Sequence, residues 1–179
     1  MNLETKNLKR IIEDKTFVDV YTDSYDESTY GFIIDFNDTF LVLDSFDDDS
    51  KANGIVVFFR ENITRIRWGG NEISSVYSLI DTSEKASTSI DIDLSSIQNI
   101  LKSMNASYGY INVSIQDIDS GICFIGEITE MDDETIVINE YGSKKSLDRT
   151  NIMISIRDIT KVEAGGQYEK GLVQLFNKN

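Results

Sequence analysis

The chain has 179 residues, of which 31 are acidic, 17 are basic, none is histidine and one is cysteine. The net charge of −14 disfavours general nucleic-acid binding, because affinity for a phosphate backbone comes mainly from lysine and arginine. The absence of histidine excludes serine–histidine and cysteine–histidine nucleophile pairs and histidine-ligated zinc, and a single cysteine cannot form a thiolate zinc cluster. Any catalysis would therefore depend on carboxylates, lysine, tyrosine, serine or a bound metal.

Hydropathy and cysteine usage predict a cytoplasmic location. No apolar run approaches the roughly 20 residues that a membrane helix needs, and the opening segment lacks the apolar core of a signal peptide. A single cysteine, Cys123, cannot form an internal disulfide and fits a reducing compartment.

The first half of the chain has the pattern of a helix followed by short strands. The spacing of Leu8, Ile11 and Ile12 predicts an amphipathic helix within residues 3–15. The acidic tract at residues 44–50 predicts a loop. Apolar or alternating runs predict strands at residues 17–20, 30–36, 40–43, 55–59 and 63–68.

The second half repeats this order. Leu94, Ile97, Leu101 and Met104 fall on one helical face, behind serine and aspartate residues suited to capping. The segments 73–80 and 167–176 are compatible with either a strand or a short helix. Strands are predicted at residues 110–118, 122–131, 135–139, 152–156 and 159–162.

One gapless offset aligns Val18 with Val113 and Gly31 with Gly126, which indicates an internal duplication. The fold class predicted is mainly β with short α-helices (α+β). The predicted division is a first domain at residues 1–80 with an N-terminal helix, a polar linker at 81–93, and a second domain at 94–179 with a preceding helix.

The repeated segments resemble the Sm-like family. Residues 31–43 and 126–138 match the apolar skeleton of its first motif, which begins at a glycine and runs through two apolar stretches. Residues 59–63 and 156–159 are similar to its second motif. The resemblance implies two tandem five-stranded small barrels, each preceded by a helix.

The RNA-binding features of that family are only partly present. Arg60, Asn62 and Arg157 are the remnants of its RNA motif, and a structural hydrogen bond or a surface pair is the alternative role for the two arginines. The motif's base-holding asparagine and its glycine are replaced, so the resemblance implies a domain without the base pocket. The replacing residues are Leu41 and Ile136 at the asparagine, and Glu61 and Asp158 at the glycine.

Aromatic and acidic residues of the first half are the candidates for binding a partner. Tyrosine is common at binding hot spots, and a strongly acidic surface complements a basic protein. Trp68 alternates with Ile66 and is expected to be buried. The partner-binding candidates are Tyr21, Tyr25, Tyr30, Asp47, Asp48 and Asp49.

Three function classes remain open. The first is a non-enzymatic protein-interaction module, an adaptor or an immunity or inhibitor protein that binds a basic partner. The second is an Sm-like RNA-binding protein, and the third is a metal-dependent hydrolase using aspartate tracts such as residues 47–49 and 132–134. The first is favoured, with no catalytic residue, no metal and no cofactor expected, and with a homo-oligomer left open.

Overall fold

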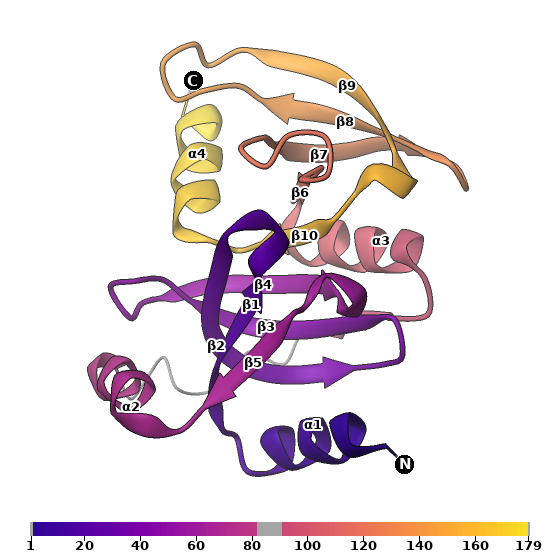
Figure 1. The fold of residues 1–179 in the computed structure, drawn as a ribbon. Helices are drawn as coiled ribbons and strands as arrows, with labels where there is room; N and C mark the ends of the chain where they lie inside the picture. Colours follow the sequence, from indigo (N-terminus) through magenta and orange to yellow (C-terminus); the bar gives the residue numbers. More distant parts are fainter. Residues whose placement is uncertain (1, 82–90, 179) are drawn as a thin grey trace. The chain divides into compact units, whose positions relative to one another are not determined.

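A computed structural model describes residues 2–81 and 91–178 and divides the chain into two compact units, Met1–Ser89 (unit 1) and Ile90–Asn179 (unit 2). Both units are mainly β with short helices, so the predicted fold class is confirmed at this level (Figure 1). Most of the predicted linker at 81–93, namely residues 82–90, lies outside the described residues. No helix in the described part is long and apolar enough to span a membrane.

Unit 1 consists of one antiparallel sheet with a helix at each end of its sequence. The strand order is β5-β1-β2-β3-β4, and the described pairings do not join β4 to β5, so this sheet is not closed into a barrel. The ambiguous segment at residues 73–80 is helical. The elements are α1 (Leu3–Glu13), β1 (Phe17–Thr22), η1 (Asp23–Tyr25), β2 (Glu27–Phe36), β3 (Phe40–Phe46), β4 (Ala52–Phe59), η2 (Arg60–Asn62), β5 (Arg65–Trp68) and α2 (Gly70–Leu79).

The sheet of unit 1 buries apolar side chains on both faces, because α1 contacts β2 and α2 contacts β1. Asn2 caps α1 by accepting a 2.8 Å hydrogen bond from the amide of Thr5. The α1 face is mainly aliphatic and contains Leu8, Ile11, Val18, Val20, Ile33, Leu41, Leu43, Val56 and Phe58. The α2 face is aromatic and contains Phe17, Phe32, Phe46, Ile73 and Ile80.

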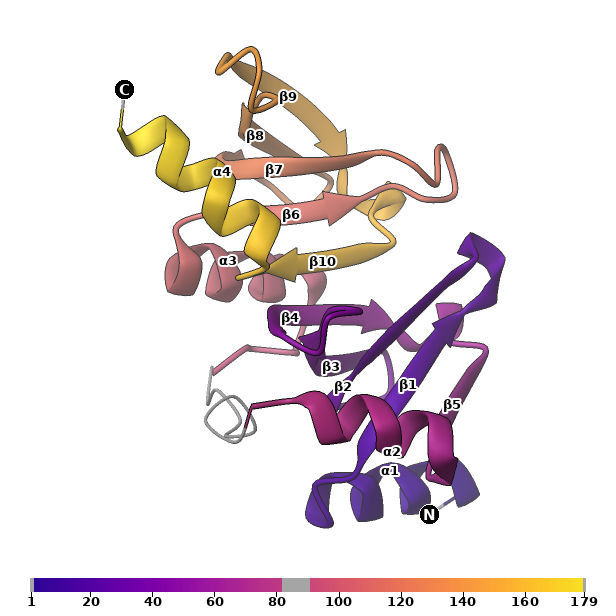
Figure 2. The ribbon, with the colours of Figure 1, turned by 90° about the vertical axis from the view of Figure 1, so that its left-hand side faces the viewer.

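Unit 2 has the same succession of α-helices and strands and the strand order β10-β6-β7-β8-β9 (Figure 2). Its first helix is capped by Ser96, whose hydroxyl accepts from the amide of Asn99 at 3.1 Å. The second ambiguous segment, residues 167–176, is also helical. The elements are α3 (Ile97–Tyr108), β6 (Ile111–Ser114), β7 (Cys123–Met131), β8 (Thr135–Tyr141), β9 (Arg149–Ser155), η3 (Ile156–Asp158), β10 (Lys161–Ala164) and α4 (Gln167–Asn177).

The two units correspond closely from β2 and β7 onward. Gly31 and Gly126 stand where the next strand comes closest, and a Cβ on either would lie 2.3 or 2.4 Å from a carbonyl oxygen of that strand. The first strands of the two units, β1 and β6, correspond with a smaller offset in residue number. Val18 of β1 pairs with Gly31, whereas Ile111 of β6 pairs with Gly126, so Val18 corresponds to Ile111. The predicted alignment of Val18 with Val113 is therefore wrong by two residues, and the longer β6–β7 loop accommodates the difference.

We expect Tyr110 to make the stability of the protein sensitive to alkaline pH. Burial raises its pKa to about 12, although the amide of Gly165, which donates to its oxygen at 3.2 Å, opposes this shift. A tyrosine whose pKa is higher in the folded than in the unfolded state stabilises the fold below the unfolded value of about 10. That contribution is lost as the pH rises from about 10 to about 12.

We therefore expect urea midpoints to fall between about pH 10 and pH 11.5, with a shallower fall in Tyr110→Phe. Unfolding curves at several pH values check this. An unchanged slope in Tyr110→Phe would contradict the assignment to Tyr110.

Candidate functional site

A row of polar side chains crosses the α2 face of unit 1. In the strand register Arg67 lies opposite Asp19, and Asp19 lies opposite Tyr30. Asp19 is 0% exposed, although aspartate is rarely buried without a partner. The sheet thus places a buried carboxylate between an arginine and a tyrosine.

The carboxylate of Asp19 is joined to an ion-pair chain that reaches the surface. Arg67 Nη2 lies 2.8 Å from Asp19 Oδ2, and Arg67 Nη1 lies 3.3 Å from Glu72 Oε2. Hydrogen bonding to these two carboxylates raises the pKa of the Arg67 guanidinium. The second oxygen, Asp19 Oδ1, and Arg67 Nε are buried and have no hydrogen-bond partner among the described residues. The pair is therefore in direct contact but incompletely satisfied in its hydrogen bonds.

Tyr21 lies beside the same carboxylate. Hydrogen bonding to Asp19 raises the pKa of its phenol, because the carboxylate favours the protonated form, and burial raises it further. The guanidinium carbons of Arg65 and Arg67 lie 4.0 and 5.0 Å from the centre of the Tyr21 ring. Tyr21 is thus held by two cation–π contacts.

Asp19→Asn is expected to lower the pKa of Tyr21 toward its ordinary value of about 10, since the negative charge beside the phenol is removed. Titration of the Tyr21 ring resonances by NMR measures this, with circular dichroism to confirm that the variant is folded. A Tyr21 titration identical to that of the parent protein would show that Asp19 does not control this phenol.

An open pocket of about 460 Å³ lies next to this chain of ion pairs, at the turn from β5 into α2. It is lined by residues 66–73 and is called the β5–α2 pocket below. Gly69 and Gly70 form the turn with φ of +75° and +80°, a conformation that glycine adopts without strain. Trp68 lines the pocket and is 44% exposed, so the expectation that it is buried is wrong. It lies at the end of β5, the terminal strand of this sheet, where packing is incomplete.

Unit 2 has different chemistry at the corresponding place. Asn112 occupies the position of Asp19, lies opposite Glu163 and donates to Glu169 Oε1 at 2.8 Å, with both partners buried. Lys161 lies 3.4 Å from Glu163. Cys123 is exposed as a residue, but partial desolvation of its sulfur and the carboxylates of Glu163 and Glu169 raise the pKa of the thiol, which disfavours a reactive thiolate. The duplicated position is buried and polar in both units, but only unit 1 has the aspartate–arginine pair.

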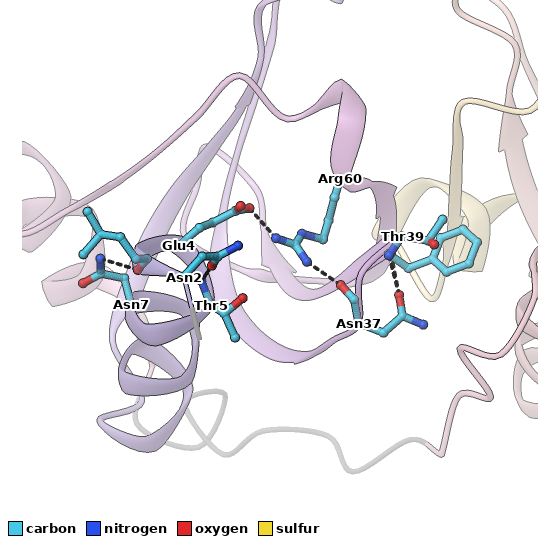
Figure 3. A network of polar contacts seen from close by, with 9 residues as sticks. Asn2, Glu4, Thr5, Asn7, Asn37, Thr39 and Arg60 are labelled. Atoms are coloured by element: carbon cyan, nitrogen blue, oxygen red, sulfur yellow. Dashed lines mark hydrogen bonds and ion pairs between the residues drawn. The ribbon is translucent and has the colours of Figure 1, made fainter.

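Arg60 forms a second polar network, between α1 and the β2–β3 hairpin (Figure 3). Its guanidinium donates to the carbonyl of Asn37 at 2.6 Å and to the carboxylate of Glu4. The Asn37 side chain in turn accepts from the amides of Thr39 and Phe40, both at 2.8 Å. Arg60 therefore has a structural role within unit 1.

The backbone shows that Arg157 does not occupy the position of Arg60, contrary to the sequence prediction. Helix η3 begins at Ile156, whose amide donates to Glu134 at 2.8 Å, just as the Arg60 amide donates to Thr39 at 2.8 Å. Arg157 thus stands at the position of Glu61, and its side chain is 87% exposed. Asn62 ends η2.

The remaining predicted partner-binding residues lie at one end of the sheet. The β1–β2 turn, which contains Tyr25, and the β3–β4 loop leave the antiparallel sheet on the same side. Tyr30 lies at that end in the aromatic cluster, where burial and nearby carboxylates, including Asp48, raise its pKa. Asp44 is buried in β3, so the loop predicted at residues 44–50 begins later than expected.

The acidic loop itself is held by one of its own side chains. Asp47 accepts from the amides of Asp49 and Lys51 at 3.0 and 2.9 Å, whereas Asp48 and Asp49 are exposed. Within the described ranges, no group of three or more carboxylate or cysteine side chains is arranged to hold a metal ion.

Comparison of the chain with protein-family models, with curated proteins and with solved structures found no match.

Proposed function

We propose that the chain is a non-enzymatic, cytoplasmic protein-interaction module that binds a basic protein. One observation carries the proposal: buried ionisable groups are bonded within the fold, as in the Asp19–Arg67 pair, while loop carboxylates such as Asp48 and Asp49 face solvent. Together with the net charge of −14, these carboxylates favour rapid association with a positively charged surface.

We further propose that both units are Sm-like domains. The support is a helix followed by five antiparallel strands in the same order, with a glycine at the closest approach of the second and third strands. An RNA-binding role is less well supported, because the guanidinium of Arg60 already donates hydrogen bonds to Asn37 and Glu4 within unit 1.

A specific form of the proposal is an immunity or inhibitor protein that neutralises a basic toxin. Co-expression with the toxins encoded beside its gene tests this form, and protection by the intact chain is the expected result. Failure to protect against each of them would remove this form and leave the general proposal in place.

The general proposal is tested by purifying the tagged chain from its own host, with and without nuclease treatment. A stoichiometric basic protein that co-purifies in both conditions is the expected result. A co-purifying assembly that is lost on nuclease treatment would overturn the proposal in favour of RNA binding.

A further inference from the structure

An open pocket of about 330 Å³ lies on the sheet of unit 2, beside the β7–β8 turn, and is called the β7–β9 pocket below. Val137 of β8 lies opposite both Glu130 of β7 and Met153 of β9, so these three side chains are on one face of the sheet. Tyr141 shares that face four residues farther along β8, and its ring centre lies 4.9 Å from that of Phe176 in α4. The row is therefore on the α4 side of the sheet.

The apolar part of this pocket is Met153, which is 73% exposed on the terminal strand β9, next to the half-buried Val137. Methionine packs on partners of different shape, because its side chain is unbranched and polarisable. One exposed apolar residue is ordinary by itself. Here it lies in the same row as the carboxylate of Glu130, so the pocket offers apolar surface and negative charge together.

The charged part of the pocket has one sign. Its lining residues include Glu130 and Asp132 and neither lysine nor arginine, whereas Arg67 lines the β5–α2 pocket. The basic residue of β9 that shares this face, Arg149, already lies 3.3 Å from Glu127. A cation that enters the β7–β9 pocket would therefore meet carboxylates without a competing basic side chain in its lining.

The β7–β8 turn adds to this negative charge. Residues 130–134 contain four acidic residues and no basic one. In unit 1 the corresponding turn has an arginine of its own, since Arg60 donates to its backbone at 2.6 Å, but in unit 2 the buried Ile156 stands at that position. The next residue, Arg157, lies 3.7 Å from Asp158. The turn beside the pocket therefore keeps a surplus of negative charge.

We propose that the β7–β9 pocket of unit 2 binds a segment of the basic partner in which an apolar side chain stands beside a lysine or arginine. The apolar side chain covers Met153 and Val137, and the cation faces Glu130. Charge complementarity favours this occupant, because a second copy of this chain, with its net charge of −14, would bring like charge to an acidic pocket. This inference rests on the proposed function and adds the place of contact and the apolar requirement.

Methionine methyl groups make the pocket directly observable by NMR, because the chain has only four methionines. Met153 reports on the pocket, and Met104, which is 0% exposed in α3, is the internal reference. The probe is a capped heptapeptide in which lysine alternates with leucine, and its match has serine in place of leucine. We expect the leucine peptide to bind the full chain about fivefold more tightly than the serine peptide and to shift the Met153 signal but not the Met104 signal.

Met153→Gln and Glu130→Gln are each expected to weaken binding of the leucine peptide about fivefold, since the first removes the apolar contact and the second the carboxylate. The matched controls lie outside the pocket: Ile118→Gln replaces a side chain that is 65% exposed, and Asp48→Asn neutralises an exposed carboxylate of unit 1. Each control should change the affinity by about twofold or less. Thermal melts verify that each variant is folded.

The outcomes separate this inference from the proposed function. Equal binding of the two peptides, with the Met153 signal unmoved, would overturn the pocket and leave a basic partner in place. A Met153 signal that moves with the concentration of the chain alone would overturn it in favour of a second copy. No binding of either peptide at low ionic strength would count against both this inference and the proposed function.

Discussion

Alanine at Gly31 is expected to destabilise the protein by about 3 kcal/mol, because the added Cβ overpacks a site with no free space. That atom would lie 2.3 Å from the carbonyl oxygen of Asp44 and 2.8 Å from Cγ of Leu43. Both neighbours belong to β3, so relief requires the two strands to move apart. Urea unfolding followed by Trp68 emission measures the loss.

Gly171→Ala is the matched control for this substitution. Gly171 lies inside α4, and a Cβ there would meet only the flexible end of Lys144 at 3.5 Å. Alanine is expected to stabilise α4 by about 1 kcal/mol, because glycine is a poor helix former. Equal stability of Gly31→Ala and the parent protein would contradict the close approach of β2 to β3.

Loss of the Arg60 side chain is expected to cost about 2 kcal/mol, since its hydrogen bonds involve a charged donor in a largely enclosed position. The guanidinium joins α1, through Glu4, to the β2–β3 hairpin, through Asn37 (Figure 3). Arg60→Ala would leave the Asn37 carbonyl without this donor and release α1 from the hairpin. Chemical denaturation of Arg60→Ala, Glu4→Ala and the double variant gives the coupling between the two side chains.

Arg157→Ala is the comparison variant for Arg60→Ala. Both arginines were matched to the same sequence motif, but Arg60 is largely enclosed whereas Arg157 is exposed. Its side chain is 87% exposed and 3.7 Å from Asp158, so its removal should leave stability unchanged within about 0.5 kcal/mol. If both arginines proved equally important, the assignment of Ile156 to the Arg60 position would be wrong.

Hydrophobic periodicity was sufficient to predict α1, α3 and the strands in their order. Leu8, Ile11 and Ile12 mark α1, and the capping serine Ser96 marks the start of α3. The identity of α2 and α4 was ambiguous from the sequence, because a short amphipathic segment next to a sheet fits either a strand or a helix. Both segments are helices that contact a sheet, α2 at β1 and α4 at β8, and each buries an apolar residue, Ile73 in α2 and Leu172 in α4.

The candidate site was predictable only in part. Tyr21 and Tyr30 were named from residue type as partner-binding residues, a role that stays a prediction, whereas the buried carboxylate of Asp19 beside them was not foreseen. Asp19 gives no local signal, since its role depends on Arg67, which is far away in sequence and adjacent only through β1–β5 pairing. The two-residue difference in register also hid the equivalence of Asp19 and Asn112.

We propose that this acidic chain binds a basic protein without nucleic acid. Native mass spectrometry of the assembly captured by the tagged chain tests it most directly, because the mass identifies each component and its copy number. We expect a complex of this chain with a stoichiometric protein rich in lysine and arginine, unchanged by nuclease. A complex whose additional mass is RNA, or one that falls apart on nuclease treatment, would contradict it.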